Sequence, residues 1–175
     1  MLKGSQINLR LMRESDLDEY IRLSHNVAAR GEYFPLDLRS EAQIRAKFRE
    51  DGFWTDDFRT MLIVDQETDV VIGSIGAFKP VFYQDSLELG YILYDKERRG
   101  RGIMAEAVRL YCDYLFRWKN IFRIQLQIET PNIPSRRTAE KAGFTHEGTL
   151  RQCLIVKGVP LDMEMYSMLR SEFEG

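Results

Sequence analysis

The most constraining feature of this chain is a glycine-rich loop between a strand-like run and a helix-like run. The loop, residues 98–102, reads Arg-Arg-Gly-Arg-Gly. The apolar run 87–93 precedes it, and the long amphipathic run 103–118 follows it. Glycines let backbone N–H groups surround an anion, a helix start adds partial positive charge, and arginines donate in pairs to phosphate oxygens. The loop therefore predicts a site for a pyrophosphate group.

The rest of the pattern predicts a mixed α+β fold in a single domain spanning residues 1–175. About four helices are expected, over 15–27, from Ser40 to the glycine loop at 52, over 103–118 and over 132–143. Ser15 and Ser40 are each expected to open a capping box, and Asn132 to cap the last helix. Short turns between the early strands favour antiparallel pairing. About seven strands are expected: 6–11, 59–65, 70–79, 86–93, 123–128, 144–156 and 162–169.

Composition excludes several classes of partner. The formal net charge is −2, which argues against nucleic acid as the main partner. The two cysteines, Cys112 and Cys153, have no paired spacing, so a disulfide framework and a four-cysteine zinc site are excluded. The two histidines, His25 and His146, also lack a metal-binding pattern, and we expect no metal. No apolar run approaches the roughly 18 residues that cross a bilayer. We expect a cytoplasmic protein without a membrane segment.

Two other phosphate-binding motifs compete for the loop. Gly100-x-Gly102-x-x-Ala105 matches the dinucleotide fingerprint, and Glu129 ends a strand about two dozen residues later. However, residues 94–99 separate the loop from its strand, and too little chain follows Glu129 for the further βαβ units of a nicotinamide domain. The loop of nucleoside triphosphatases ends in Gly-Lys-Ser/Thr, which is absent here.

Three segments together carry a family resemblance. Residues 88–93, Glu-Leu-Gly-Tyr-Ile-Leu, precede the loop and Ala-Glu-Ala follows it at 105–107; Asn132-x-x-Ser135 comes next, and then residues 139–148 with a Gly-Phe pair. In this order and spacing the chain resembles the GCN5-related N-acetyltransferase (GNAT) family, and within it the RimJ/RimL-like ribosomal-protein N-acetyltransferase branch. The family loop reads Gln/Arg-x-x-Gly-x-Gly/Ala, and Glu97 departs from it at the first position.

The resemblance implies a mostly antiparallel central sheet flanked by helices, with acetyl-CoA as co-substrate and direct transfer of the acetyl group to a primary amine. The amine belongs to a protein N-terminus or to a small molecule. Backbone groups near Ile92 and Leu93 are expected at the thioester, and Asn132 at the pantetheine amide. The residues expected to bind acetyl-CoA are Ile92, Leu93, Arg98, Arg99, Gly100, Arg101, Gly102, Ile103, Met104 and Asn132.

The catalytic groups are less defined by the sequence. Glu88, on the strand before the loop, is a candidate general base; alternatively it is a strand carboxylate paired with a cross-strand arginine. Glu32 is a second candidate. Many members of the family use a tyrosine as the general acid at the position where this chain has Ala139. Ser135 is then the expected proton donor to the thiolate, unless its hydroxyl only caps the helix, and Tyr166 is an alternative donor or a core residue.

Aromatic residues in the loops around the second helix are expected to border the acceptor site; packing against the sheet is the competing interpretation. The candidates for substrate binding are Tyr33, Phe34 and Trp54. Because the usual tyrosine is missing, a non-catalytic coenzyme A-binding module that regulates a partner remains a second hypothesis. The resemblance also leaves a homodimer open, by analogy alone.

Overall fold

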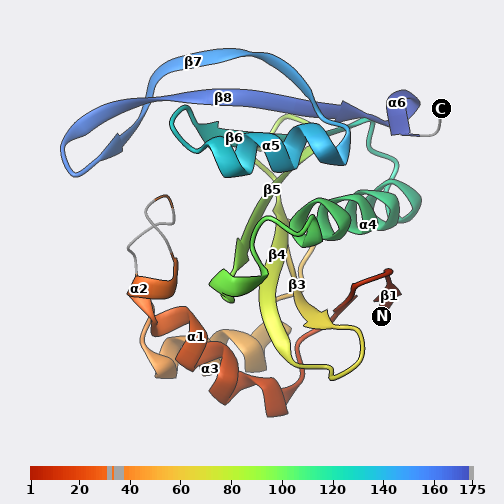
Figure 1. The fold of residues 1–175 in the computed structure, drawn as a ribbon, viewed down its shortest axis with the longest axis vertical. Coiled ribbons are helices and arrows are strands. Elements are labelled where there is room, and N and C mark those ends of the chain that lie inside the picture. Colours follow the sequence, from red (N-terminus) through yellow and green to blue (C-terminus); the bar gives the residue numbers. More distant parts are fainter. Residues whose placement is uncertain (31–32, 34–37, 174–175) are drawn as a thin grey trace.

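A computed structural model describes residues 1–30, 33 and 38–173. Its centre is one sheet in the order β1-β2-β3-β4-β5-β6-β8-β7, with eight strands rather than the seven expected (Figure 1). The additional strand β1 has two residues, too few to show an alternating pattern. The strands are β1 Leu2–Lys3, β2 Ile7–Arg10, β3 Phe58–Asp65, β4 Val71–Phe78, β5 Ser86–Leu93, β6 Arg123–Glu129, β7 Thr145–Val156 and β8 Val159–Leu169. The mixed α+β fold and the mostly antiparallel sheet are confirmed.

The four predicted helices are all present, together with shorter ones. The helices are α1 Leu17–His25, α2 Val27–Arg30, α3 Glu41–Asp51, α4 Ile103–Trp118, α5 Ile133–Ala142 and α6 Arg170–Phe173, with 3-10 turns η1 Glu14–Asp16 and η2 Lys96–Arg98. Four-residue helices are too short to show periodicity, which is why α2 and α6 were not predicted. No helix in the described part of the chain has the length and apolar character needed to cross a membrane.

Helix starts follow the expected capping chemistry in one case and not in the other. Ser40 Oγ accepts the backbone N–H of Gln43, and the Gln43 side chain accepts the backbone N–H of Ser40, as a capping box requires. The prediction for Ser15 is wrong. Asp16 instead accepts the backbone N–H of Arg13 at 2.7 Å. The chain forms the 3-10 turn η1, Glu14–Asp16, and α1 begins after it, at Leu17.

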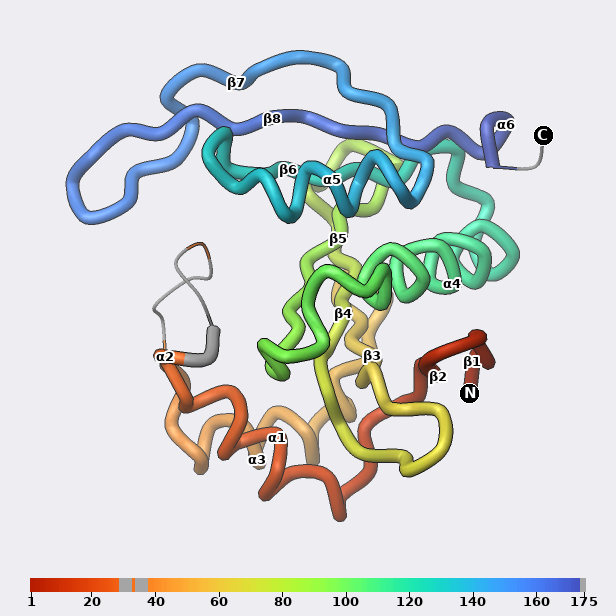
Figure 2. The backbone as a smooth tube through the Cα atoms, viewed as in Figure 1, coloured from red at the N-terminus to blue at the C-terminus, as the bar shows by residue number. Residues whose placement is uncertain are grey.

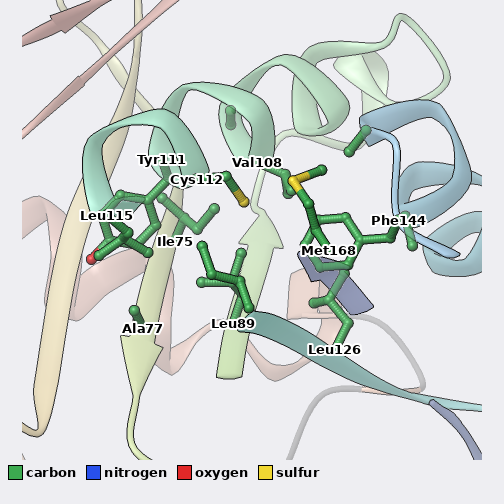
Figure 3. Packing of buried hydrophobic residues seen from close by; sticks show 14 of the residues in the cluster. Ile75, Ala77, Leu89, Val108, Tyr111, Cys112, Leu115, Leu126, Phe144 and Met168 are labelled. Carbon is green, nitrogen blue, oxygen red and sulfur yellow. The ribbon is translucent and has the colours of Figure 1, made fainter. Parts of the chain in front are cut away.

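Two hydrophobic clusters fill the two faces of the sheet. The larger lies under α4 and α5; Figure 3 shows Val108, Tyr111 and Leu115 of α4 above Ile75 and Leu89 of the sheet. The smaller cluster lies under α1 and α3 and takes up alternate residues of the same strands. In the β5 strand, Leu87 and Leu89 face α4, and Glu88 between them faces the opposite side.

The feature that positions the site is a divergence between β5 and β6. These two strands pair in parallel only at their beginning, in the register Ser86↔Arg123, Leu87↔Ile124 and Glu88↔Gln125. Beyond that point β5 stays with β4, and β6 stays with β8. Figures 1 and 2 show β6, β8 and β7 running across the end of the β3–β5 layer. We call the opening between residues 89–93 of β5 and 126–129 of β6 the fork.

Candidate active site

The glycine loop follows the open end of β5 and leads directly into α4. Gly100 and Gly102 have φ of +77° and +82°, in the left-handed region that favours glycine. Gly102 is the N-cap of α4 and brings no capping side chain, and a Cβ at either glycine would meet nothing within 4 Å. In the described part of the chain, no acceptor meets the backbone N–H groups of residues 100–104. The start of α4 therefore presents a row of free donors to an anion.

The three arginines of the loop differ in what they contact. Arg98 pairs with Asp65 at the end of β3, and its Nε donates to Asp95 at 3.1 Å. The hydrogen bond from Arg98 lowers the pKa of Asp65 well below its usual range. Arg99 Nη2 donates to the carbonyl oxygen of Leu93 at 3.1 Å. Arg101 is exposed and makes no hydrogen bond or ion pair with the described residues.

All three arginines were expected to bind acetyl-CoA, and their surroundings differ. Arg98 donates from Nε to Asp95 and from Nη1 to Asp65. Arg98 therefore fastens the loop to the end of β3. Arg101, which has no such partners, is the arginine with donors to spare for a ligand.

Backbone groups along β5 alternate between the two edges of the strand. The N–H of Tyr94 donates to the carbonyl of Ile72 on β4 at 2.9 Å. In an antiparallel ladder every second residue bonds to the same neighbouring strand. The backbone groups of Ile92 therefore also face β4, and those of Tyr91 and Leu93 face the fork. Ile92 and Leu93 were both expected at the thioester; the register separates them, and of the two only Leu93 presents its backbone to the fork.

Glu88 lies at the vertex of the fork, where the two strands part. Its Oε2 accepts the side-chain amides of Gln125 at 2.8 Å and Gln127 at 3.0 Å, both from β6. Burial raises the pKa of Glu88 above the ordinary carboxyl value, while the two amides oppose the shift. A carboxylate with a raised pKa is better matched to accept a proton near neutral pH.

The competing interpretation of Glu88, pairing with a cross-strand arginine, is wrong. The arginine nearest in register, Arg123, donates both Nη atoms to Glu147 on β7 at 2.7 Å. This pairing lowers the pKa of Glu147 to about 2. Glu88 is thus held by neutral amides and keeps its own negative charge unpaired by a cation among the described residues.

Ser135 lies on the first turn of α5, beside the other arm of the fork. Asn132 Oδ1 accepts the backbone N–H of Ser135 at 3.2 Å, which confirms Asn132 as the helix cap. The Ser135 hydroxyl lies 2.8 Å from the hydroxyl of Tyr91 on β5. Burial raises the pKa of Tyr91 to about 12. Tyr91 was not among the predicted site residues, although its alternation with Leu89 and Leu93 places it on the face that α5 covers.

The other proton-donor candidate lies in the core. Tyr166 is 1% exposed, and its hydroxyl donates to Glu140 and accepts from Arg136. Its ring packs against His146, which lies 2.6 Å from the buried Glu164. Tyr166 is therefore a core residue, as the alternative interpretation held. Among the described residues, no group of three or more acidic, histidine or cysteine side chains is arranged to hold a metal ion.

The predicted substrate-binding aromatics separate in the structure. The Tyr33 hydroxyl donates to the carbonyl of Pro131 at 3.2 Å, next to the start of α5. Trp54 packs instead against Tyr114 of α4, with the guanidinium of Arg59 4.9 Å from its ring centre. Trp54 thus lies on the α4 face, opposite to Glu88, which favours the competing interpretation that it packs against the core. Phe34, and Glu32 as second base, lie outside the described residues.

Comparisons with known proteins agree with this geometry. An Acetyltransferase (GNAT) domain matches residues 6–145. The "Probable N-acetyltransferase YjcK" of Bacillus subtilis is 29% identical over 99% of both chains, and the "Uncharacterized N-acetyltransferase p20" of Bacillus licheniformis is 36% identical over 65% of this chain and 63% of its own. The spermidine N-acetyltransferase of Vibrio cholerae, solved with CoA and spermine, shares the fold with a TM-score of 0.83 at 22% identity, over 98% of this chain and all of that one. The chain belongs to the GNAT acetyltransferase family and is an N-acetyltransferase.

Proposed function

We propose that this chain moves an acetyl group directly from the thioester of acetyl-CoA to a primary amine, and that residues 1–175 form one catalytic domain acting in the cytoplasm. The observation that carries the proposal is the row of unpaired N–H groups at residues 100–104, at the start of the 16-residue helix α4. These donors and the open space beside Gly100 and Gly102 suit a diphosphate. The donor set of the chain therefore fits the co-substrate.

The remaining binding roles follow from the geometry. Arg99 and Arg101 add charge at the diphosphate, while Arg98 keeps the loop in place through Asp65. The backbone N–H and C=O groups that Tyr91 turns toward the fork can pair with pantetheine amides, as a further strand would. The carbonyl of Leu93, next along the same edge, already accepts Arg99 Nη2. Asn132, at the far side of the fork, is the side chain that reaches the pantetheine.

In this proposal the chemistry has three parts. Glu88, directly or through one water, takes a proton from the amine as its nitrogen bonds to the acyl carbon. The N–H of Leu93 holds the acyl oxygen as negative charge develops there; losing one such donor typically costs about 2.7–4 kcal/mol. Ser135 gives its proton to the sulfur as the carbon–sulfur bond breaks. An amine with a pKa of about 7.7–8.0 is partly neutral at physiological pH, so a weak base suffices.

The finer assignment is a RimJ/RimL-like enzyme whose acceptor is a protein N-terminus or a small amine. The Asn132-x-x-Ser135 segment supports that branch, because it supplies a serine where Ala139 leaves no tyrosine hydroxyl. The Vibrio cholerae enzyme was solved in complex with CoA and spermine, which supports a small polyamine as the other acceptor class.

The test is amine-dependent release of the coenzyme A thiol from acetyl-CoA, with spermidine and free-N-terminus peptides as the acceptors and N-acetylated peptides as the control. We expect thiol release that requires a free primary amine. Tight coenzyme A binding without release across the whole panel would instead support a regulatory coenzyme A-binding module. Absence of coenzyme A binding would contradict the placement of the loop.

A further inference from the structure

We propose that Tyr91 is a positioning residue for proton delivery: its hydroxyl donates to Ser135 Oγ and thereby directs the Ser135 proton into the fork. The inference deepens the proposed function, since it rests on Ser135 as the group that protonates the departing sulfur. It assigns a role to a side chain on the opposite arm of the fork from Ser135, brought to it only by the fold.

The contact spans the fork. Tyr91 belongs to β5, past the point where β5 pairs with β6, and Ser135 belongs to α5, which follows β6. Their hydroxyl oxygens lie 2.8 Å apart, at the usual length for two hydroxyls. The pair is therefore a direct link between the arm that carries the loop and the arm that carries the proton donor.

Hydrogen-bond bookkeeping indicates which hydroxyl donates. The Tyr91 hydrogen has two acceptors within reach, Ser135 Oγ at 2.8 Å and the Ser135 carbonyl at 3.4 Å. The shorter contact is the better one, because hydrogen bonds to a carbonyl at 3.4 Å are at the weak limit. Tyr91 then occupies one lone pair of Ser135 Oγ, and the Ser135 hydrogen has to point elsewhere.

A neighbouring residue on the same helix shows the usual alternative. Hydroxyls on helices often donate back to the carbonyl of the preceding turn. Thr138 does so, since its Oγ1 donates to the carbonyl of Pro134 at 3.0 Å. Ser135 makes no such bond with the described residues, and its oxygen is instead engaged by Tyr91. The Ser135 proton is consequently available to a ligand in the fork.

Burial raises the pKa of Tyr91 to about 12, so its hydroxyl keeps the hydrogen that this arrangement requires. A phenol that stays protonated through the physiological range keeps its hydrogen available to Ser135 at every working pH. Tyr91 does not need to lose its proton in the reaction. It stabilises the serine oxygen as that oxygen transfers its own proton to sulfur, and solvent then restores the serine.

A double-mutant cycle with Tyr91→Phe and Ser135→Ala tests the inference. The rate of thiol release is measured with spermidine and with a free-N-terminus peptide as acceptors. Varying the acetyl-CoA concentration then gives kcat and the KM for acetyl-CoA. We expect kcat to fall about tenfold in Tyr91→Phe and about a hundredfold in Ser135→Ala, with KM little changed. The double variant should be no slower than Ser135→Ala, and Ser135→Thr should retain sensitivity to Tyr91→Phe.

Tyr94→Phe is the matched control. It removes another buried tyrosine hydroxyl, which lies 3.1 Å from the hydroxyl of Ser74, in the same region of the chain. We expect Tyr94→Phe to lose a similar amount of stability and to keep the wild-type kcat. Additive losses in the cycle, or equal kcat in Tyr91→Phe and Tyr94→Phe, would overturn the inference.

A second readout needs no acceptor amine. The thiol of bound coenzyme A is titrated by the ultraviolet absorbance of its thiolate. We expect a lower thiol pKa in the wild type than in Tyr91→Phe or Ser135→Ala, because the oriented serine stabilises the thiolate. An identical thiol pKa in all three proteins would refute the role of Tyr91 alone, whereas failure to bind coenzyme A would refute the proposed function itself.

Discussion

Replacing Gly102 by alanine separates the conformational role of the loop from its binding role. Gly102 has φ +82°, and a Cβ there meets nothing within 4 Å. Gly52, the C-cap of α3, has φ +63° and equally open space. The left-handed conformation costs an L-residue about 1–2 kcal/mol, partly offset because alanine restricts the unfolded chain by about 0.4–1 kcal/mol. Each substitution should therefore cost about 1 kcal/mol and lower Tm by about 2–4 °C.

The two variants should differ in binding. The open space beside Gly102 is where we place the diphosphate, so a methyl group there displaces it from the N–H groups of residues 103–104. We expect Gly102→Ala to weaken acetyl-CoA binding at least tenfold, about 1.4 kcal/mol, and Gly52→Ala to leave it unchanged. Thermal unfolding and isothermal titration calorimetry measure both quantities. Wild-type affinity in a folded Gly102→Ala protein would refute the reasoning.

Four further predictions concern the base, the loop and Trp54. Glu88→Gln should lower kcat by about a hundredfold. Burial raises the pKa of Glu88, so wild type loses stability as the carboxyl ionises between pH 4 and pH 7; measured by denaturation, the variant should gain stability relative to wild type over that range. Gln127→Leu removes one donor to the carboxylate and should move the acid limb of the kcat/KM profile to higher pH. Asp65→Asn should weaken acetyl-CoA binding a few-fold, measured by calorimetry. Because the pKa of Asp65 is lowered in the folded state, its carboxylate contributes stability at neutral pH that is lost in acid, and the variant should lack this contribution. Trp54→Leu should lower Tm and leave the acceptor KM unchanged, because Trp54 packs on the α4 face; a raised acceptor KM would return it to the substrate site.

The sequence predicted the elements that short-range rules govern. The strand before the loop, Ser86–Leu93, and the helix after it, Ile103–Trp118, begin and end where expected, because periodicity and the glycines of the loop both act locally. Asn132 caps α5 and Gly143 ends it in the left-handed conformation, as capping chemistry predicts. The prediction of a cap at Ser15 was wrong because the side chain of Asp16 accepts the backbone N–H of Arg13 instead.

The parts that the sequence could not predict depend on contacts between distant residues. Nothing in the local sequence distinguishes Arg98 from Arg99 and Arg101, because its partner Asp65 lies on a distant strand. Gln125 and Gln127 carry no motif, and they meet Glu88 only because β6 pairs in parallel with β5. Tyr91 meets Ser135 only across the fork. Trp54 shares its loop region with the predicted acceptor aromatics, yet the sheet places it on the opposite face from Glu88.

A crystal structure with coenzyme A bound tests the central claim most directly. The account predicts diphosphate oxygens about 2.7–3.2 Å from backbone nitrogens between Gly100 and Met104, with the sulfur in the fork beside Ser135. A coenzyme A molecule bound elsewhere, with those five N–H groups facing solvent, would contradict it.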